Sequence, residues 1–350
     1  MGKLLHMIKK ITKCLKYYID EYRKERENKD SFASLNLPNL TKEEKNIIKS
    51  KWGKFVYNIS LCYYEYRVYK HVYGFDVNFI PLSVYVRLLD KLNFKNDRIA
   101  LSNKSLFPLY LSNVNQPHTI CYSIGGMHYN SNHDIISQEE VVSIICGQGT
   151  LMIAKPSVDT ACGKGVVKLD AYLNKDDVKQ LLTQLGNDYI IQRKVDQCEV
   201  LNYLNKSSLN TFRVTSVLLN NKIVVTSICL KIGKNGALCD NLGFGGIIVG
   251  VNIDGTLKEY GVDKNGNKYD SFNGILLKDV KIPMINDVIN IAKKTHMMLP
   301  TCRIVGCDIA VDEDNKALLI EANLKFPGIT LEQMCTGPIL ESILRMLFHY

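Results

Sequence analysis

Two carboxylates and an amide occupy regular positions in one predicted β-hairpin, residues 303–323. The apolar stretches IVGCDIAV and ALLIEANL flank a polar turn, 312–316. With that turn, Asp308 lies opposite Glu321 or its immediate neighbour, and Glu321 and Asn323 share a face because strand residues alternate. Such an oxygen-only set suits Mg²⁺ that bridges phosphates, and carboxylates this close repel unless a cation joins them. A charged hairpin facing solvent is the alternative, although a buried acid needs a partner.

A glycine-bearing loop follows a lysine in the stretch AKPSVDTACGKGV, residues 154–166. Lys155 ends a predicted strand, and Lys164 adds a second positive charge in the loop. Glycines let backbone amides approach phosphate oxygens. The stretch is not a P-loop, which requires G-x-x-x-x-G-K-[ST]. A phosphate-covering loop and a simple glycine hairpin both fit, and the polar and glycine positions concerned are Ser157, Thr160, Gly163 and Gly165.

Further polar side chains lie at the ends of later predicted strands. Asn210 and Arg213 stand at the head of one strand, and Lys231 ends its partner strand. An arginine in this place can hold a phosphate or a carboxylate through two hydrogen bonds. Asn241 precedes a glycine run and another strand. Each feature is ordinary alone, and it is their order along the chain that is informative.

The elements that position these groups become clear after about residue 150. The pattern there predicts strand, loop, strand, helix and strand, followed mainly by hairpins. The predicted strands are 151–155, 166–169, 189–195, 213–219, 223–231, 247–253, 303–311 and 317–323, and the predicted helices are 176–185, 285–297 and 338–348. Upstream, residues 41–73 have a helical pattern with an aromatic face that we interpret as core, whereas 76–150 are mixed and rich in loops.

The composition is that of an ordinary folded chain. Of 350 residues, 46% are hydrophobic and 23% charged, which excludes wholly disordered, collagen-like and coiled-coil proteins. No apolar run is long enough to span a membrane, and we expect no secretory signal. Eleven cysteines without a C-x-x-C pair predict reduced thiols in a cytoplasmic protein. The net charge of +9 favours anionic partners without choosing among them.

The first thirty residues form a basic amphipathic segment. Apolar residues recur there at helical spacing, and lysines and arginines occupy much of the rest. Such a helix can lie on an anionic membrane surface, which would place the protein peripherally at the inner face of the membrane. The alternative is a helix that packs on its own protein. We favour packing, because Asp20, Glu21, Glu25 and Glu27 interrupt the basic face.

Taken in order, five segments resemble the ATP-grasp superfamily, and most of all its sugar-transfer-associated branch. They are IAKPSVDTACGKGV, YIIQRKV, SSLNTFRVTSVL, DNLGFGGIIVGV and GCDIAVDEDNKALLIEANLKFPG, which span about residues 150–330. The resemblance implies an α+β fold in which two α+β lobes hold ATP between them, with an extra helical N-terminal region. The implied parts are a helical region, 1–75; an N-terminal lobe, 76–150; a small subdomain with the phosphate-covering loop, 151–195; and a C-terminal lobe with the magnesium site, 196–350.

The resemblance also implies roles for single residues. Lys155 would contact the α- and β-phosphates, Lys231 would be the second phosphate lysine, and Arg213 would steady the γ-phosphate or an acyl phosphate. Residues 192–195 would form the hinge whose backbone reads adenine, although QRKV lacks the acid often found there. The full implied nucleotide set is Lys104, Lys155, Ser157, Gly163, Gly165, Gln192, Arg193, Lys194, Val195, Glu199 (on the ribose), Lys231 and Asn241; the metal set is Asp308, Glu321 and Asn323; the catalytic set is Arg213, Lys231 and Asn210.

The implied function is that of an ATP-dependent carboxylate–amine ligase. ATP phosphorylates a carboxylate, and an amine attacks the acyl phosphate to give an amide, ADP and phosphate. Family context points to surface-polysaccharide assembly, with a sugar acid joined to an amino acid or amine. The alternatives are phosphoryl transfer to a hydroxyl and nucleotide binding without catalysis. A nucleic-acid partner is not expected, because the positive charge comes without a basic–aromatic motif.

Overall fold

An antiparallel sheet with two helices forms the first lobe of the computed structural model, which describes residues 19, 22, 23, 26, 29–158, 165–236 and 242–339. Its strand order is β3-β2-β1-β6-β4-β5. The strands are β1 (Thr119–Ile124), β2 (Met127–Asn130), β3 (Ile135–Ile136), β4 (Met152–Pro156), β5 (Val167–Leu169) and β6 (Tyr189–Arg193). Helices α7 (Gln138–Cys146) and α8 (Lys175–Leu185) bury their apolar faces against this sheet. Ser137 and Glu140 cap α7 reciprocally, and Asn174 caps α8, which fixes where both helices begin.

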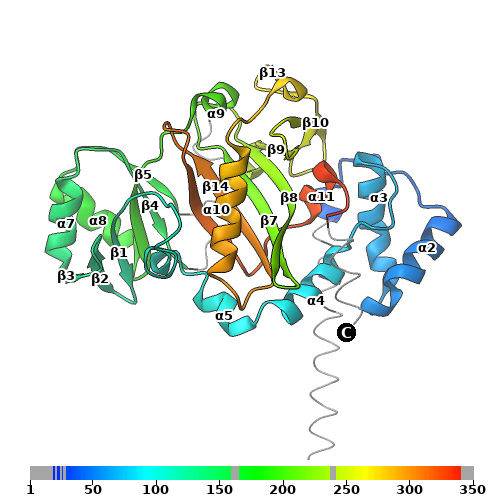
Figure 1. Cartoon of the computed structure of the whole chain (residues 1–350), viewed down its shortest axis with the longest axis horizontal. Helices are drawn as coiled ribbons and strands as arrows, with labels where there is room; N and C mark the ends of the chain where they lie inside the picture. Colours follow the sequence, from blue (N-terminus) through cyan, green and yellow to red (C-terminus); the bar gives the residue numbers. More distant parts are fainter. Residues whose placement is uncertain are drawn as a thin grey trace, which may run out of the picture.

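A larger antiparallel sheet forms the second lobe, with the strand order β11-β10-β9-β8-β7-β14-β15. Its strands are β7 (Thr211–Leu219), β8 (Lys222–Ile232), β9 (Ile247–Val251), β10 (Leu257–Val262), β11 (Lys268–Tyr269), β14 (Ile304–Val311) and β15 (Ala317–Asn323). Helix α10 (Ile285–Met297) covers one face (Figure 1). Helix α9 (Glu199–Leu204) follows the first lobe, and β12 (Ser271–Phe272) pairs with β13 (Ile275–Leu276) in a separate ribbon.

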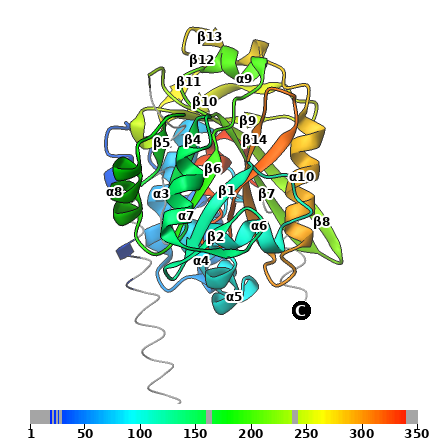
Figure 2. The ribbon, with the colours of Figure 1, turned by 90° about the vertical axis from the view of Figure 1, so that its left-hand side faces the viewer.

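The N-terminal helices cover part of the opposite face of the large sheet, together with the last described helix. Figures 1 and 2 show α3 and α11 on the side of the sheet away from α10. The helices concerned are α2 (Lys42–Trp52), α3 (Cys62–Val72), α4 (Leu82–Leu92) and α11 (Thr330–Thr336); α5 (Lys95–Ala100) and α6 (Phe107–Tyr110) lead to the first lobe. Their buried side chains form one apolar cluster with sheet residues such as Val217, Cys229 and Ile304. The aromatic face predicted as core is confirmed by the full burial of Trp52 and Tyr66.

Most predicted elements after residue 150 are present, and the helical stretch 41–73 is broken. Short turns of 3₁₀-helix, Gly53–Phe55 and Ile59–Leu61, separate α2 from α3. The break has a local cause, since the Asn58 side chain accepts a hydrogen bond from Ser60 N and starts a new helical turn. The predicted helix 338–348 and most of residues 1–30 lie outside the described residues. No helix among the residues described is long and apolar enough to cross a membrane.

Candidate functional site

The predicted acids stand side by side on the β14–β15 hairpin. In its register Asp308 pairs with Glu321, which is one of the two pairings that the sequence left open, and Gly306 pairs with Asn323. The alternate residues of β14 pack in the core beneath α10. The three polar side chains therefore face the other side of the sheet, where the N-terminal helices lie.

Asp308 is held by cations from the two neighbouring strands. Arg213, its cross-strand partner on β7, donates from Nε and Nη2 to Oδ1 and Oδ2 at 2.6 and 3.0 Å. Lys231 Nζ on β8 and Asn323 Nδ2 lie 3.2 and 3.3 Å from Oδ2. Burial alone would raise the pKa of Asp308, but the charges of Arg213 and Lys231 outweigh it and hold that pKa well below its usual range. Asp308 is therefore an anion at neutral pH.

Two lysines of the first lobe reach the same hairpin. Lys104 Nζ lies 3.0 Å from Glu321 Oε1, and the Lys104 backbone N–H donates to the carbonyl of Ser157 just beyond β4. Lys155, on β4 itself, is close enough to Lys104 and Glu321 for their charges to shift its pKa. Burial lowers its pKa to about 8, Glu321 opposes that shift and Lys104 adds to it. The two lobes therefore meet in a cluster of opposite charges.

A further acid, Glu332 on α11, was missed by the sequence interpretation. Its Oε1 lies 3.6 Å from Arg213 Nη1, and its side chain is buried. Burial raises the pKa of Glu332 to about 7, and Arg213 and Lys231 only partly offset that effect. The signal in the sequence was a single acid in the stretch ITLEQMCTGPIL, which has no other charged residue. Its place beside Arg213 depends on how a seven-residue helix docks, which no local pattern encodes.

Asn210 lies apart from this cluster. Its amide donates to the carbonyls of Leu201 and Asn205 at 2.9 and 3.0 Å, and its oxygen accepts from Gly233 N at 3.3 Å. The side chain is fully buried and ties α9 to the end of β8. These contacts give it a structural task, and its catalytic role stays a prediction.

The expected hinge joins the two lobes at the end of β6. Gln192 Nε2 donates to the Pro117 carbonyl at 3.3 Å, and the backbone N–H groups of Arg193 and Lys194 donate to neighbouring carbonyls at 2.9 Å each. Lys194 also pairs with Asp196. Glu199 is the exposed first residue of α9, just beyond Val195 and the hinge. The structure thus places these residues along one connection, and their contacts with adenine and ribose stay predictions.

The ends of the glycine-bearing loop are described, and its middle is not. Ser157 N donates to the Asp188 carbonyl at 3.0 Å, and its hydroxyl is buried without a hydrogen-bond partner among the described residues. Gly165 has φ +74°, and a Cβ there would lie 2.8 Å from Pro156 Cγ, so the position requires glycine. Gly163 and Asn241 lie outside the described residues, as do Thr160 and Lys164.

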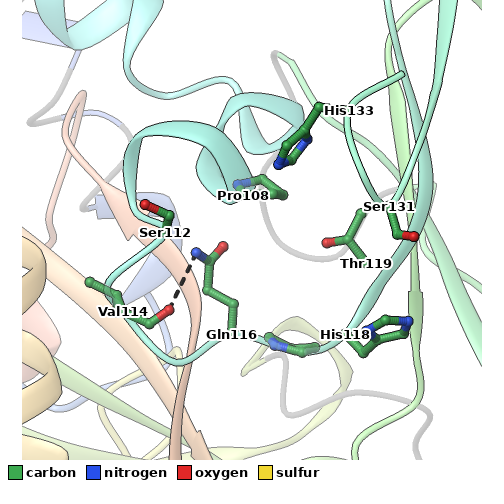
Figure 3. A pocket seen from close by; sticks show the side chains of 9 residues that line it. Pro108, Ser112, Val114, Gln116, His118, Thr119, Ser131 and His133 are labelled. Atoms are coloured by element: carbon green, nitrogen blue, oxygen red, sulfur yellow. Dashed lines mark hydrogen bonds between the residues drawn. The ribbon is translucent and has the colours of Figure 1, made fainter. Parts of the chain in front are cut away.

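A pocket of about 260 Å³ lies elsewhere on the first lobe (Figure 3). Gln116, His118, Thr119 and His133 are among its lining residues, and none of the predicted site residues lines it. Gln116 is turned toward its own loop, where its amide donates to the carbonyl of Leu111 at 2.9 Å. His133 Nδ1 lies 3.0 Å from the hydroxyl of Tyr122. The pocket is therefore separate from the charged cluster.

The donor set at the hairpin fits a hard divalent cation. Two carboxylates and one amide oxygen are ligands that Mg²⁺ accepts, and Glu321 is 30% exposed and reachable. Over the described ranges no group of three or more His, Cys, Asp or Glu side chains could hold a metal. Asp308, Glu321 and Asn323 would hold the cation. In this structure Lys104 and Lys231 neutralise the same carboxylates.

Comparison with known proteins assigns the family. The sequence matches the family model described as sugar-transfer associated ATP-grasp over residues 75–347. The chain belongs to this family. The predicted membership is confirmed, and the two sheets with their helices form an α+β ATP-grasp fold, as predicted. No curated protein matches the sequence.

Similarity to solved ATP-grasp structures is low. The N5-carboxyaminoimidazole synthase of Aspergillus clavatus shares 8% identity at a TM-score of 0.40, over 70% of this chain and 51% of that one. The D-alanyl-alanine synthetase A of Vibrio cholerae shares 9% at 0.40, over 73% and 60%. The D-alanine–D-alanine ligase of Coxiella burnetii shares 10% at 0.44, over 75% and 64%. The chain thus spans between about half and two thirds of the length of these proteins.

Proposed function

We propose that this ATP-grasp protein is an ATP-dependent carboxylate–amine ligase that acts through an acyl phosphate. The observation that carries the proposal is the meeting of both lobes at the hairpin. Lys104 and Lys155 come from the first lobe, whereas Glu321 and Asp308 come from the second. A phosphoryl group between the lobes would be surrounded by cations and by a site for Mg²⁺, as phosphoryl transfer requires.

The chain's own residues then position and neutralise the reacting groups. Lys104, Lys155 and Lys231 supply positive charge to the phosphates, and Arg213 is fixed by Asp308 on one edge and by the Pro327 carbonyl at 2.8 Å on Nη1. Such a fixed guanidinium can stabilise developing charge without reorganising. Asp308, Glu321 and Asn323 would hold Mg²⁺, which would supply further positive charge to the phosphates. No side-chain nucleophile is required by this chemistry.

The experiment measures ADP release from ATP and Mg²⁺ with a panel of acids and amines. Suitable acids are glucuronic and galacturonic acid and the α-amino acids, and suitable amines are ethanolamine, glycine, alanine and glucosamine. A ligase releases ADP only when an acid and an amine are both present, and its product has the mass of their amide. ADP release with a hydroxyl compound alone, and transfer of a phosphoryl group to it, would instead establish a kinase. Nucleotide binding with no turnover for any pair would establish a binding protein.

A pair of lysine variants separates site chemistry from surface charge. Lys104→Met should abolish turnover, because it removes the cation beside Glu321. Lys316→Met removes a lysine that pairs with Asp314 at the solvent-exposed end of the same hairpin and should leave turnover intact. Equal activity of both variants would contradict the proposed site.

The biological setting remains part of the proposal. The family description suggests that one substrate carries a sugar, and we propose a sugar acid as the carboxylate. A cytoplasmic location and peripheral membrane contact through residues 1–30 stay predictions. Sedimentation of the intact protein with anionic liposomes, at low and at high salt, would test that contact.

A further inference from the structure

Several buried side-chain oxygens beside Arg213 have no hydrogen-bond partner among the described residues. They are Glu332 Oε2, Thr215 Oγ1, Tyr85 Oη and Ser227 Oγ. All four side chains are at most 5% exposed. A buried polar group without a partner costs about 1–3 kcal/mol, so such groups are rare and call for an explanation.

These oxygens gather in one place from four elements. Thr215 follows Arg213 by two residues on β7, so both face the same side, and Ser227 on β8 is the cross-strand partner of Thr215. The Thr215 hydroxyl is near enough to Glu332 on α11 to interact with that carboxyl and lower its pKa, although the two groups do not meet in hydrogen-bonding geometry. Burial raises the pKa of Tyr85 on α4 well above its usual value, with Glu332 adding to the shift and Arg213 opposing it. The cluster therefore lies directly behind the guanidinium that Asp308 holds.

Arg213 donates no hydrogen bond to these oxygens. Its Nε and Nη2 bind Asp308, and its Nη1 binds the Pro327 carbonyl, with only a 3.6 Å contact to Glu332 Oε1. The unpartnered atoms are a carboxylate oxygen and three hydroxyl oxygens, all of which can accept hydrogen bonds. A group with several N–H bonds would complement them. An amino group is the smallest group of that kind.

We propose that Glu332, Tyr85, Thr215 and Ser227 form the pocket that receives the amino group of the acceptor amine, with Glu332 as its proton acceptor; this proposal rests on the ligase function proposed above. The amine arrives as an ammonium ion and gives one proton to the Glu332 carboxylate. Its nitrogen lone pair then attacks the acyl phosphate carbon. The C–N bond forms, the C–O bond to phosphate breaks, and the departing phosphate keeps that electron pair and takes the second amine proton.

The electrostatic setting of Glu332 suits this proton transfer. Burial raises its pKa to about 7, and the charged and titratable groups around it are Arg213 on β7, Lys231 and Cys229 on β8, Asp308 on β14, Tyr85 on α4 and Cys335 on α11. A base whose pKa lies near the working pH exchanges protons most effectively. Asp308, held well below that range by its two cations, cannot take this role.

The loop before α11 packs directly over these oxygens. A Cβ at Gly328 would lie 2.4 Å from Glu332 Oε1 and 3.1 Å from Arg213 Nη1. In the same loop Phe326 is 43% exposed, and its ring meets that of Tyr85 edge-to-face at 6.1 Å. The loop therefore separates the buried oxygens from solvent with its smallest residue nearest to them.

The experiment uses one variant and compares an amine that is largely unprotonated at neutral pH with amines that are protonated there. Hydroxylamine is largely unprotonated at neutral pH and traps acyl phosphates as hydroxamates, whereas ethanolamine and the amino acids are ammonium ions. Glu332→Gln should form hydroxamate at nearly the wild-type rate and should lose about 10²–10⁴-fold in the rate with the ammonium substrates. Raising the pH should restore part of the loss, because more free amine is then present.

Glu65→Gln is the matched control. Glu65 on α3 is another buried acid whose pKa burial raises to about 7, but it is hydrogen-bonded to Leu82 N and to the Tyr69 hydroxyl, both at 2.8 Å. Its replacement should leave the ratio of the two rates unchanged. If Glu332→Gln misfolds, Tyr85→Phe serves instead. That variant removes a hydroxyl without a described partner and should raise KM for the ammonium substrate several-fold with KM for ATP unchanged.

Four outcomes would overturn the proposal. Glu332→Gln could lose both rates equally, which would make Glu332 a support for Arg213, or it could keep both. Where Tyr85→Phe is needed instead, an unchanged KM for the amine would also contradict the proposed pocket. A wild-type protein that forms no hydroxamate with any acid of the panel would instead refute the ligase chemistry and the amine pocket with it.

Discussion

Two buried acids, Asp308 and Glu332, lie beside the guanidinium of Arg213. They differ in how closely they contact it. Asp308 receives two hydrogen bonds from Arg213 and the charge of Lys231, whereas Glu332 has a single contact at 3.6 Å. The pKa of Asp308 is therefore lowered and that of Glu332 raised, although both are buried. This difference separates a permanent anion, suited to cations, from a group that gains and loses a proton near neutral pH.

Removing charge at the hairpin tests the roles of its two carboxylates. Glu321→Gln should lower ADP production at limiting Mg²⁺ by at least about 100-fold with little loss of stability, since Glu321 is partly exposed. Asp308→Asn should abolish activity and also cost about 3–5 kcal/mol, because Arg213 would lose its buried partner. ADP assays across Mg²⁺ concentrations and thermal unfolding measure both effects. Full activity of both variants at limiting Mg²⁺ would remove the metal assignment.

The protonation of Glu65 should appear in the pH dependence of stability. Burial raises its pKa from the model-compound value of 4.5 to about 7. Between these values the folded protein holds a proton that the unfolded chain has lost, so stability falls as the pH rises through this window. Urea unfolding at about pH 5 and about pH 8 should show a loss in the wild type that is about 2–3 kcal/mol larger than in Glu65→Gln. Equal losses would show that Glu65 titrates normally.

At the scale of elements, sequence patterns predicted single strands and hairpins well. They did not predict which strands lie side by side in the sheet. Apolar alternation and the polar turn predicted the bounds of β15 and placed Asp308 opposite Glu321 or its immediate neighbour, and the structure has the first of these pairings. The position of β14 beside β7, which brings Arg213 to Asp308, joins segments far apart in sequence. Local patterns cannot report such a pairing, and the roles of Arg213 and Lys231 came from the family resemblance. The docking of α11, and with it Glu332, was invisible for the same reason.

One glycine of β14 governs how closely the loop before α11 approaches the sheet. A Cβ at Gly306 would lie 2.8 Å from Pro327 O and 2.9 Å from Pro327 Cβ. Pro327 O in turn accepts the hydrogen bond from Arg213. Gly306→Ala should therefore cost about 1–3 kcal/mol and reduce kcat, because the loop must move away from the guanidinium.

Gly53→Ala provides the control for this change. Gly53 has φ −56°, and its nearest neighbour to an added Cβ is Lys49 Cγ at 3.6 Å, so alanine fits there. Chemical denaturation and steady-state kinetics on both variants measure the difference. A Gly306→Ala protein as active and stable as Gly53→Ala would show that the loop adapts without consequence.

The whole molecule has a core that extends beyond the family match. The match begins at residue 75, yet Phe32, Ile48 and Trp52 belong to the apolar cluster that covers the large sheet behind Arg213. Gln333 of α11 also binds the hydroxyl of Tyr69 and the backbone of Ile80. The N-terminal helices therefore complete the fold and hold the helix that carries Glu332.

Deletion of residues 1–74 should consequently destabilise the second lobe as a whole. The truncation would expose sheet residues such as Val217, Cys229 and Ile304, which are at most 1% exposed in the full chain. Each large apolar side chain uncovered costs about 1.5–3 kcal/mol, and several together exceed the stability of a typical domain. We expect the shortened chain to aggregate or to bind a hydrophobic dye strongly, whereas the full chain does neither. A soluble truncation with a cooperative thermal transition close to that of the full chain would show instead that the sheet and α11 form a self-sufficient unit, and that Glu332 is positioned by the second lobe alone.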